Sequence, residues 1–191
     1  MTRIIGGTAG GRRLRTPPGD ATRPTSDRVR EALFSALQSE FGTLAGLRFL
    51  DLYAGSGAVA LEAASRGAVG VTAVESDRRT ARIVMANAAA LGFEVDVRAR
   101  PVAAVVASSP PGPFDVVFLD PPYALGTDEL TAVLAALVSH GWVEQGGAVV
   151  VERSARSVEP GWPEGLEVQR HKTYGETALW YLRCVSDRSD T

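Results

Sequence analysis

The sequence predicts an α/β protein whose core is a mostly parallel sheet. From residue 47 onward, short apolar runs typical of buried strands alternate with segments of helical periodicity, which indicates parallel strands joined by helices. The chain then closes with two strand-like runs and a short connection, which indicates an antiparallel hairpin. With 191 residues, of which 45% are hydrophobic and 22% charged, the chain suits one soluble domain with a sizeable core.

The first 24 residues are rich in Gly, Arg and Pro, and they predict a small hairpin or an extended arm followed by a loop. A helix is expected next, because Thr25 or Ser26 can cap it and Asp27 is well placed in its first turn. Apolar residues recur on one face of this segment at helical spacing, namely Val29, Leu33, Leu37 and Phe41.

The core alternates between strands and helices in a regular order. Five strands are expected at residues 48–53, 69–75, 95–99, 114–119 and 148–152. Helices are expected at 58–66, 78–91 and 128–139, with a short further segment at 102–107. The closing hairpin is expected at 166–171 and 177–183, with residues 172–176 as its connection, which completes a seven-stranded sheet. We therefore divide the chain into an arm at 1–24, a main domain at 25–184 and a tail at 185–191.

Composition excludes several classes of protein. No apolar stretch approaches the roughly 20 residues that span a bilayer, and no signal-peptide core follows Met1, so a cytoplasmic protein is expected. The single cysteine, Cys184, excludes an internal disulfide and a zinc site built from several cysteines. The two histidines, His140 and His171, are too few and too far apart in sequence to form a metal cage, so no metal is expected.

Positive charge is concentrated at the N-terminus. The formal net charge is −2, yet residues 1–30 hold seven arginines and two aspartates, a balance of +5, which leaves −7 for the remainder. A polyanion could be held there through its phosphates. On this hypothesis Arg12, Arg13 and Arg15 contact phosphates, while Arg23 and Arg28 line the mouth of the active site. The alternative is a solvated, partly disordered basic tail.

A glycine loop follows the first core strand. Gly55, Ser56 and Gly57 stand between that strand and a helix start, where the backbone can approach a nucleotide-sized ligand closely. The spacing also satisfies a relaxed dinucleotide pattern, so an NAD-dependent enzyme is an alternative. Asp51 disfavours it, because a carboxylate beside the loop repels a pyrophosphate but suits a cofactor with a cationic amino-acid end. Glu75, at the end of the next strand, can accept both hydroxyls of a ribose.

The segment Asp120–Tyr123 follows the apolar strand at 114–119, and it suits an exocyclic amine on a planar base. The lone pair of such an amine is delocalised into the ring, so a catalyst must hold both N–H bonds and free the lone pair for an electrophile. Asp120 and the backbone carbonyl of Pro121 can accept these two hydrogen bonds. Pro122 keeps the segment rigid, and Tyr123 can stack on the base. A strand end with a Pro-Pro stop is the structural alternative.

Together, Asp51, the glycine loop and Glu75 resemble the S-adenosylmethionine site of class I methyltransferases, and Asp120–Tyr123 falls where the amino-methylating members carry Asp/Asn-Pro-Pro-aromatic. The resemblance implies a Rossmann-like fold with S-adenosyl-L-methionine as cofactor. That family usually places an acid after its third strand to bind the adenine amine, and this chain has Arg98–Val102 there, so backbone atoms are expected instead. The cofactor residues it implies are Asp51, Tyr53, Ala54, Gly55, Ser56, Gly57, Glu75, Ser76, Arg100 and Val102.

The N-terminal segments Ile4–Gly7, Gly11–Leu14 and Arg23–Glu31 resemble the opening of bacterial 16S ribosomal RNA guanine-N2 methyltransferases. Lys172-x-Tyr174 continues the likeness, which covers nearly the whole chain. The resemblance implies methyl transfer to the N2 amine of one guanine in small-subunit RNA, presented within an assembled particle. Lys172 and Tyr174 could border the active-site mouth as RNA-binding residues, and as residues of the hairpin turn they could equally be structural. A monomer is expected. The alternatives are an amino methyltransferase acting on DNA adenine or protein glutamine, an oxidoreductase, and a non-catalytic RNA-binding module.

Overall fold

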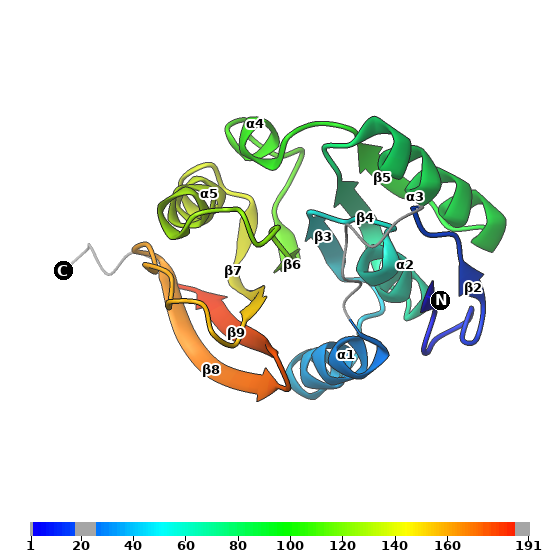
Figure 1. Ribbon diagram of the computed structural model, residues 1–191, viewed down its shortest axis with the longest axis horizontal. Helices are drawn as coiled ribbons and strands as arrows, with labels where there is room; N and C mark the ends of the chain where they lie inside the picture. Colours follow the sequence, from blue (N-terminus) through cyan, green and yellow to red (C-terminus); the bar gives the residue numbers. More distant parts are fainter. Residues whose placement is uncertain (1, 18–25, 186–191) are drawn as a thin grey trace. The chain divides into compact units, whose positions relative to one another are not determined.

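The computed structural model describes residues 2–17 and 26–185, and it contains two compact units, residues 1–101 and 102–191 (Figure 1). Within the described residues, the larger sheet of the first unit has three strands: β3 (Arg48–Leu52), β4 (Val69–Val74) and β5 (Val95–Arg98). They are parallel and lie in the order β5-β4-β3, so Asp51 pairs with Ala73 and Val74 pairs with Arg98. The carboxyl ends of these strands therefore share one edge.

Three helices accompany these strands: α1 (Asp27–Phe41), α2 (Ala58–Ser65) and α3 (Arg78–Leu91). The hydroxyl of Ser26 accepts a hydrogen bond from the backbone N–H of Val29 at 3.2 Å, so Ser26 is the N-cap of α1. Ser26 was one of the two predicted caps. The carboxylate of Asp77 caps α3 in the same way, accepting from Thr80 at 2.7 Å. The ring of Phe34 on α1 stacks on Phe49 of β3 with centroids 6.0 Å apart.

Within the described residues, the arm is an ordered hairpin and not a solvated tail. Strands β1 (Thr2–Arg3) and β2 (Arg13–Leu14) pair in antiparallel fashion, and they lie beside α2 and α3 in Figure 1. Its apolar side chains enter a core cluster whose buried members are Ile4, Ala9, Leu14, Ala58, Leu61 and Ala88. Because this packing removes apolar surface from water, the tail interpretation is wrong for residues 2–17.

The described residues of the second unit form four strands and two helices. Its strands are β6 (Phe114–Leu119), β7 (Val143–Ser154), β8 (Leu166–Tyr174) and β9 (Thr177–Cys184), in the order β6-β7-β9-β8. Strands β6 and β7 are parallel, whereas β9 runs antiparallel to both of its neighbours. The helices are α4 (Val102–Val106) and α5 (Thr127–Ser139). Two hydrogen bonds join the ends of these helices, from the His140 ring to the Val106 carbonyl at 2.9 Å and from the Trp142 indole to Ser108 at 2.7 Å.

The closing hairpin is longer than its sequence suggested. Residues 172–174 were expected in the connection, but Lys172, Thr173 and Tyr174 continue β8 and pair with Leu179, Ala178 and Thr177 of β9. Only Gly175 and Glu176 form the turn, and Gly175 has a φ of 61°, which glycine adopts without strain. Lys172 and Tyr174 are therefore strand residues, and their assignment to a turn is wrong. The predicted boundary at residue 24 lies outside the described residues and stays a prediction.

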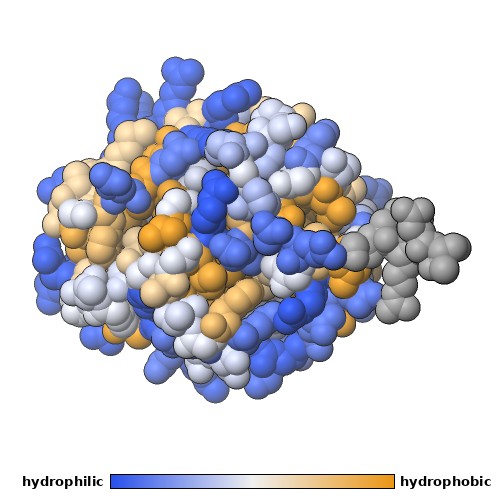
Figure 2. All heavy atoms as spheres, turned by 180° about the vertical axis from the view of Figure 1, so that it is seen from behind, coloured by the Kyte–Doolittle hydropathy of each residue, from blue (hydrophilic) through white to orange (hydrophobic). Residues whose placement is uncertain are grey.

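Figure 2 shows hydrophilic side chains over much of one face, with smaller hydrophobic patches between them. No helix within residues 2–17 and 26–185 is long and apolar enough to cross a membrane.

Candidate active site

The glycine loop leaves the carboxyl end of β3 in a backbone conformation that few side chains tolerate. Tyr53, Gly55 and Gly57 have φ angles of 65°, 54° and 81°. Tyr53 is the only residue other than glycine with a positive φ in the described part of the chain. Such left-handed backbone at a bulky residue is costly and persists where the surroundings enforce it. The strain marks the loop as a fixed feature of the fold.

Asp51 stabilises the backbone next to the loop through a buried hydrogen bond. Its side chain is only 1% exposed, and its Oδ2 accepts a hydrogen bond of 2.9 Å from the backbone N–H of Ala60 in the first turn of α2. A carboxylate at the N-terminus of a helix also interacts favourably with the helix dipole. Asp51 therefore connects the end of β3 to the helix that follows the loop, and its predicted contact with a cationic cofactor end stays a prediction.

Glu75 joins the loop to the end of β4. Its Oε2 accepts a hydrogen bond of 2.9 Å from the backbone N–H of Gly55, and its Oε1 accepts one of 2.8 Å from Asp77. The hydroxyl of Ser76 lies 3.4 Å from the same Oε1. A carboxylate can accept about four hydrogen bonds, so these three contacts orient Glu75 and leave about one acceptor position for a hydroxyl group, or two if the long contact with Ser76 is replaced. The structure thus brings together Glu75 and the glycine loop, as the sequence predicted.

Helix α3 lies against the loop from another side. A side chain at Gly57 would place its Cβ 2.7 Å from Cγ1 of Val84, so only glycine fits without a shift. Three residues further on, Asn87 donates a hydrogen bond of 3.2 Å to the backbone carbonyl of Ser56. These two contacts fix the loop between its glycines. Ala54 is tied to the sheet as well, because its N–H donates to the Val74 carbonyl at 2.9 Å.

The two remaining predicted cofactor residues lie on either side of the boundary between the units. Arg100 is exposed, and its backbone N–H donates to the carbonyl of Arg98 at 3.0 Å. The same carbonyl accepts from the N–H of Glu75 at 3.1 Å, so the turn after β5 is tied to the glutamate. Val102 begins α4 in the second unit and is 4% exposed. The expected backbone contact with an adenine stays a prediction.

The Asp120–Tyr123 segment leaves the carboxyl end of β6 in the second unit. Asp120 is half-buried and Pro121 is buried, while Pro122 is exposed. The carbonyl of Pro122 accepts a hydrogen bond of 2.9 Å from the N–H of Leu125, which closes a turn. Tyr123 is 69% exposed, an unusual environment for so large a ring. An exposed ring beside a half-buried carboxylate is suited to a ligand that arrives from solution.

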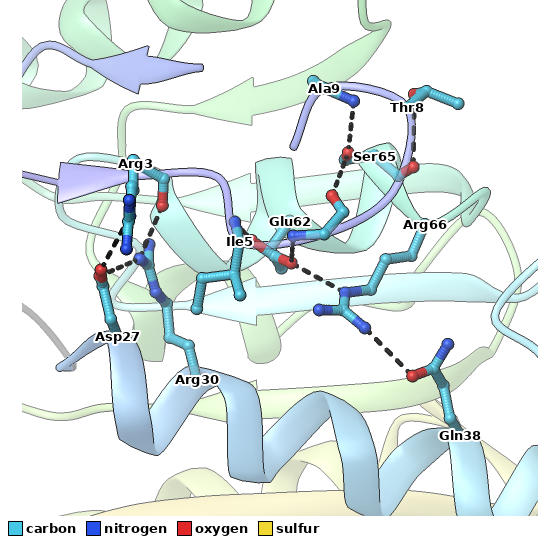
Figure 3. A network of polar contacts seen from close by, with 11 residues as sticks. Arg3, Ile5, Thr8, Ala9, Asp27, Arg30, Gln38, Glu62, Ser65 and Arg66 are labelled. Atoms are coloured by element: carbon cyan, nitrogen blue, oxygen red, sulfur yellow. Dashed lines mark hydrogen bonds and ion pairs between the residues drawn. The ribbon is translucent and has the colours of Figure 1, made fainter. Parts of the chain in front are cut away.

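The arm is fastened to α2 by buried polar groups, which Figure 3 shows at close range. The carboxylate of Glu62 accepts from the backbone N–H groups of Ile5 and Gly6 at 2.7 and 2.8 Å. The hydroxyl of Ser65 accepts from Ala9 at 2.9 Å and donates to Gly6 at 2.7 Å. Gly7 passes so close that an added Cβ would lie 2.0 Å from the Ser65 carbonyl oxygen. The backbone of the arm therefore has one fixed position against α2.

A second polar group ties the arm to α1. Arg30 is fully buried, and its Nη2 donates to the carbonyl of Arg3 and to the carboxylate of Asp27, both at 2.7 Å. Burial lowers the pKa of Arg30, and the neighbouring charge of Asp27 opposes that effect. Asp27 and Arg30 both lie on α1, so the arm is attached by the hydrogen bond of Arg30 to the Arg3 carbonyl and by the ion pair of Asp27 with Arg3 at 3.3 Å. The Asp27 carboxylate also supplies a counter-charge to the buried guanidinium.

The structure places the predicted RNA-binding residues in both units. Arg12, Arg13, Arg15 and Arg28 are exposed in the first unit, and Arg12 donates to the Ala90 carbonyl of α3 at 3.1 Å. Lys172 is exposed and Tyr174 half-buried on β8 of the second unit. Arg23 lies outside the described residues. Exposed guanidinium groups on a rigid backbone are well suited to phosphate contacts.

Sequence reasoning missed the polar residues inside the helices. Glu62 and Ser65 are buried in a helix otherwise made of Ala, Val and Leu, and Asn87 is 4% exposed on the apolar face of α3. A buried polar side chain needs a hydrogen-bond partner, so a polar residue within a helix's apolar stripe was the available signal. The hydrogen-bond partners of Ser65 and Asn87 could not be predicted, because they lie 31 to 72 positions away in the chain.

Solved structures identify the fold. The Escherichia coli protein yhhF, described as a candidate methyltransferase, matches with a TM-score of 0.87 at 32% identity, over 97% of this chain and 99% of that chain. Magnesium protoporphyrin IX methyltransferase from Synechocystis PCC 6803, solved with bound SAM, matches with a TM-score of 0.64 over 89% and 87% of the two chains. At 17% identity that likeness shows the fold alone. This is the fold of the class I methyltransferases, and the predicted fold class is confirmed.

The sequence comparisons identify the family. The model of a family described as conserved hypothetical protein 95 matches residues 2–183. Ribosomal RNA small subunit methyltransferase D from Escherichia coli (strain K12) is 36% identical over 191 residues, covering 98% of this chain and 93% of its own. A candidate rRNA methyltransferase of Bacillus subtilis (strain 168), YlbH, is 33% identical over 182 residues, or 93% and 96% of the two chains. The chain belongs to the conserved hypothetical protein 95 family, and its resemblance to bacterial small-subunit rRNA methyltransferases is confirmed.

Proposed function

We propose that this protein transfers a methyl group from S-adenosylmethionine to the N2 amine of a guanine in small-subunit (16S) ribosomal RNA. The observation that carries the proposal is the match with small subunit methyltransferase D, which extends over 98% of this chain at 36% identity. The Asp120–Tyr123 segment adds a chemical reason, because its groups suit an amine on a planar base. The glycine loop and Glu75 add a second reason, because they suit an adenosine.

The residues of the glycine loop fit S-adenosylmethionine. When bound, this cofactor supplies a methyl group on a positively charged sulfur. Glu75 would accept hydrogen bonds from the ribose hydroxyls, with its carboxylate already oriented by Gly55 and Asp77. The positive φ angles at Gly55 and Gly57 let the backbone approach the ligand closely. Asp51 would contribute negative charge near the amino-acid end.

In this proposal the Asp120–Tyr123 segment orients the amine. Asp120 accepts a hydrogen bond from one N–H and the Pro121 carbonyl accepts one from the other, which turns the nitrogen lone pair away from both acceptors. Tyr123 stacks on the base, and its exposed ring is accessible to a nucleotide flipped out of an RNA structure. Fixing the geometry of two reacting groups in this way lowers the barrier without any covalent intermediate.

Asp120 does not need to be a strong base. When the nitrogen accepts the methyl group it becomes cationic, and its proton becomes acidic enough to leave readily. A carboxylate beside a developing positive charge stabilises the transition state more than it stabilises the neutral amine. Alignment and charge stabilisation therefore account for the role of Asp120.

The exposed arginines of the arm would hold the RNA. Arg12, Arg13 and Arg15 present guanidinium groups for phosphate contacts, which fix the position of RNA without reading its sequence. Arg28 of α1 would line the mouth of the active site. Lys172 and Tyr174 would contact the same RNA from the second unit, and Arg23 would join them. We propose an assembled small subunit or assembly intermediate as the partner, with a monomeric, cytoplasmic enzyme acting on it.

The proposal is tested by methyl transfer from labelled S-adenosylmethionine to four substrates: free rRNA, small ribosomal subunits lacking the modification, DNA and protein. We expect label in N2-methylguanosine of the small-subunit RNA. Label in N6-methyladenine or methylglutamine would overturn the substrate assignment. Calorimetry with S-adenosylmethionine and with NAD tests the cofactor separately, and binding of NAD alone would overturn it.

A further inference from the structure

Asn87 connects the arm and the glycine loop through a single side-chain amide. Its Oδ1 accepts a hydrogen bond of 2.9 Å from the backbone N–H of Arg15, and its Nδ2 donates one of 2.9 Å to the Arg15 carbonyl. The same Nδ2 donates a second bond of 3.2 Å to the Ser56 carbonyl. The amide has two N–H donors, and both are used.

These bonds lie in a protected environment. Asn87 is 4% exposed on the buried face of α3, where its neighbours along the helix are Val84 and Ala88. Hydrogen bonds shielded from water are stronger, and leaving a buried amide unpaired is costly. Movement of the Arg15 backbone or of the Ser56 carbonyl therefore disturbs a shared partner.

The two contacts of Asn87 belong to regions with different proposed ligands. Ser56 stands between the two glycines of the glycine loop, and Arg15 is an exposed arginine of the arm. Helix α3 strengthens both connections. Val84 packs against Gly57 on the loop side, and the Ala90 carbonyl accepts from the side chain of Arg12 on the arm side.

The attachments of the arm to α2 and α1 have no such connection. Glu62 and Ser65 hold residues Ile5 to Ala9, as Figure 3 shows, and their hydrogen bonds lead to the arm and to Arg66. None of these bonds reaches residues 54–57. Among the described attachments of the arm, those to Glu62 and Ser65 and the one to Arg30 only fix it, whereas the one to Asn87 also contacts the glycine loop.

We propose that Asn87 is a positioning residue that couples cofactor binding at the glycine loop to the placement of Arg15 for RNA. This inference rests on the proposed function for the identity of the two ligands. A ligand that fixes the Ser56 carbonyl stabilises the Asn87 amide in the orientation that also binds Arg15. Coupling of this kind is reciprocal, so RNA held at Arg15 strengthens cofactor binding by the same factor.

The test follows amide hydrogen exchange by NMR in the full-length protein, with and without saturating S-adenosylmethionine. In the wild-type protein we expect the cofactor to slow exchange of the Arg15 amide about fivefold, at the lower end of typical couplings between sites. In Asn87→Ala we expect no cofactor-dependent slowing at Arg15. Asn87→Ser provides the same readout if Asn87→Ala does not fold, because the shorter hydroxyl cannot reach both partners.

Ser65→Ala is the matched control. It removes two hydrogen bonds to the arm, with Ala9 and with Gly6, and it leaves the contacts of the glycine loop with Glu75 and Asn87 in place. Exchange of the arm amides should rise without cofactor, and the cofactor-dependent slowing at Arg15 should remain. If Asn87 only fixed the arm, its variants would behave like Ser65→Ala.

Two results would overturn the inference alone: retention of the cofactor response in the Asn87 variants, or a wild-type Arg15 amide that does not respond while calorimetry shows that the cofactor binds. Absence of cofactor binding to the wild-type protein would instead overturn both this inference and the proposed cofactor. Failure of methyl transfer to RNA, with the Arg15 response intact, would count against the proposed substrate and leave the coupling standing.

Discussion

The glycine loop and the Asp120–Tyr123 segment both follow a buried parallel strand, yet their environments differ. Contacts from Glu75, Val84 and Asn87 hold the loop without any ligand. The Asp120–Tyr123 segment instead ends in a turn, and the ring of Tyr123 is 69% exposed. A site for a small cofactor can be prepared by the fold, because all of its partners belong to one chain. On our proposal the Asp120–Tyr123 segment receives one base of a large RNA, so the RNA supplies the contacts that complete this site when it binds.

The largest effect is expected for Asp120→Ala, which removes the proposed acceptor of the amine hydrogen bond. Loss of a preorganised group that acts in the transition state lowers turnover by a factor of about 100 to 1000. Turnover is measured as label transfer to small subunits. Asp128→Ala, an exposed acidic residue in the first turn of α5, is the control and should keep its activity. Equal activity of both variants would contradict the role of Asp120.

Gly57→Ala tests how firmly the loop is fixed. The new Cβ would lie 2.7 Å from Val84 at a φ of 81°, so we expect a loss of about 1 to 3 kcal/mol in stability together with weaker cofactor binding. Gly92→Ala has a similar φ of 73° and no atom within 4 Å, so it isolates the cost of the backbone conformation. Thermal unfolding and calorimetry measure both variants. If the two lose equal stability, contact with Val84 does not constrain the loop.

Tyr123→Ala tests the role of the exposed ring in the Asp120–Tyr123 segment. Stacking of a base on an aromatic ring contributes about 1 to 3 kcal/mol, so we expect KM for the RNA substrate to rise about 5- to 150-fold. Tyr123→Phe keeps the ring and should remain within a few-fold of the wild type. Because the ring is 69% exposed, neither change should alter the unfolding temperature much. A large drop in that temperature would show a structural role for Tyr123.

The smallest effect concerns pH and the cap of α3. Hydrogen bonds from Thr80 lower the pKa of Asp77 below its ordinary value of 3.8. A carboxyl whose pKa is lower in the folded state stabilises the fold above its unfolded pKa, and this contribution is lost as pH falls through the folded pKa. Asp77→Asn keeps a good cap but has no charge to titrate. Its stability should therefore fall less than that of the wild type below about pH 4, measured by urea unfolding. Identical acid profiles would contradict the role of this cap.

Most of the core could be predicted from the sequence because it depends on local patterns. Apolar runs gave the strands up to Leu52, Val74 and Leu119 within one residue, and glycines marked the cofactor loop between its strand and its helix. The carboxylates of Asp51 and Glu75 were found because they stand at strand ends, where ligands of this fold class bind.

Features that depend on distant residues could not be predicted. Tyr174 belongs to β8 because Thr177 pairs with it, and the pattern around Tyr174 alone does not show that partner. The length of β7 was underestimated: residues 148–152 were predicted, whereas the strand runs from Val143 to Ser154, with a register shift in its pairing with β6. The anchoring of the arm by Glu62 depends on residues 56 and 57 positions earlier.

The proposed division of roles between the glycine loop and the Asp120–Tyr123 segment is tested most directly by calorimetric titration of S-adenosylmethionine into Asp120→Ala. If the glycine loop binds the cofactor and Asp120 acts on the amine, the dissociation constant should stay within about twofold of the wild type while methyl transfer is lost, a difference under roughly 0.5 kcal/mol. Loss of cofactor binding together with methyl transfer would contradict that division of function.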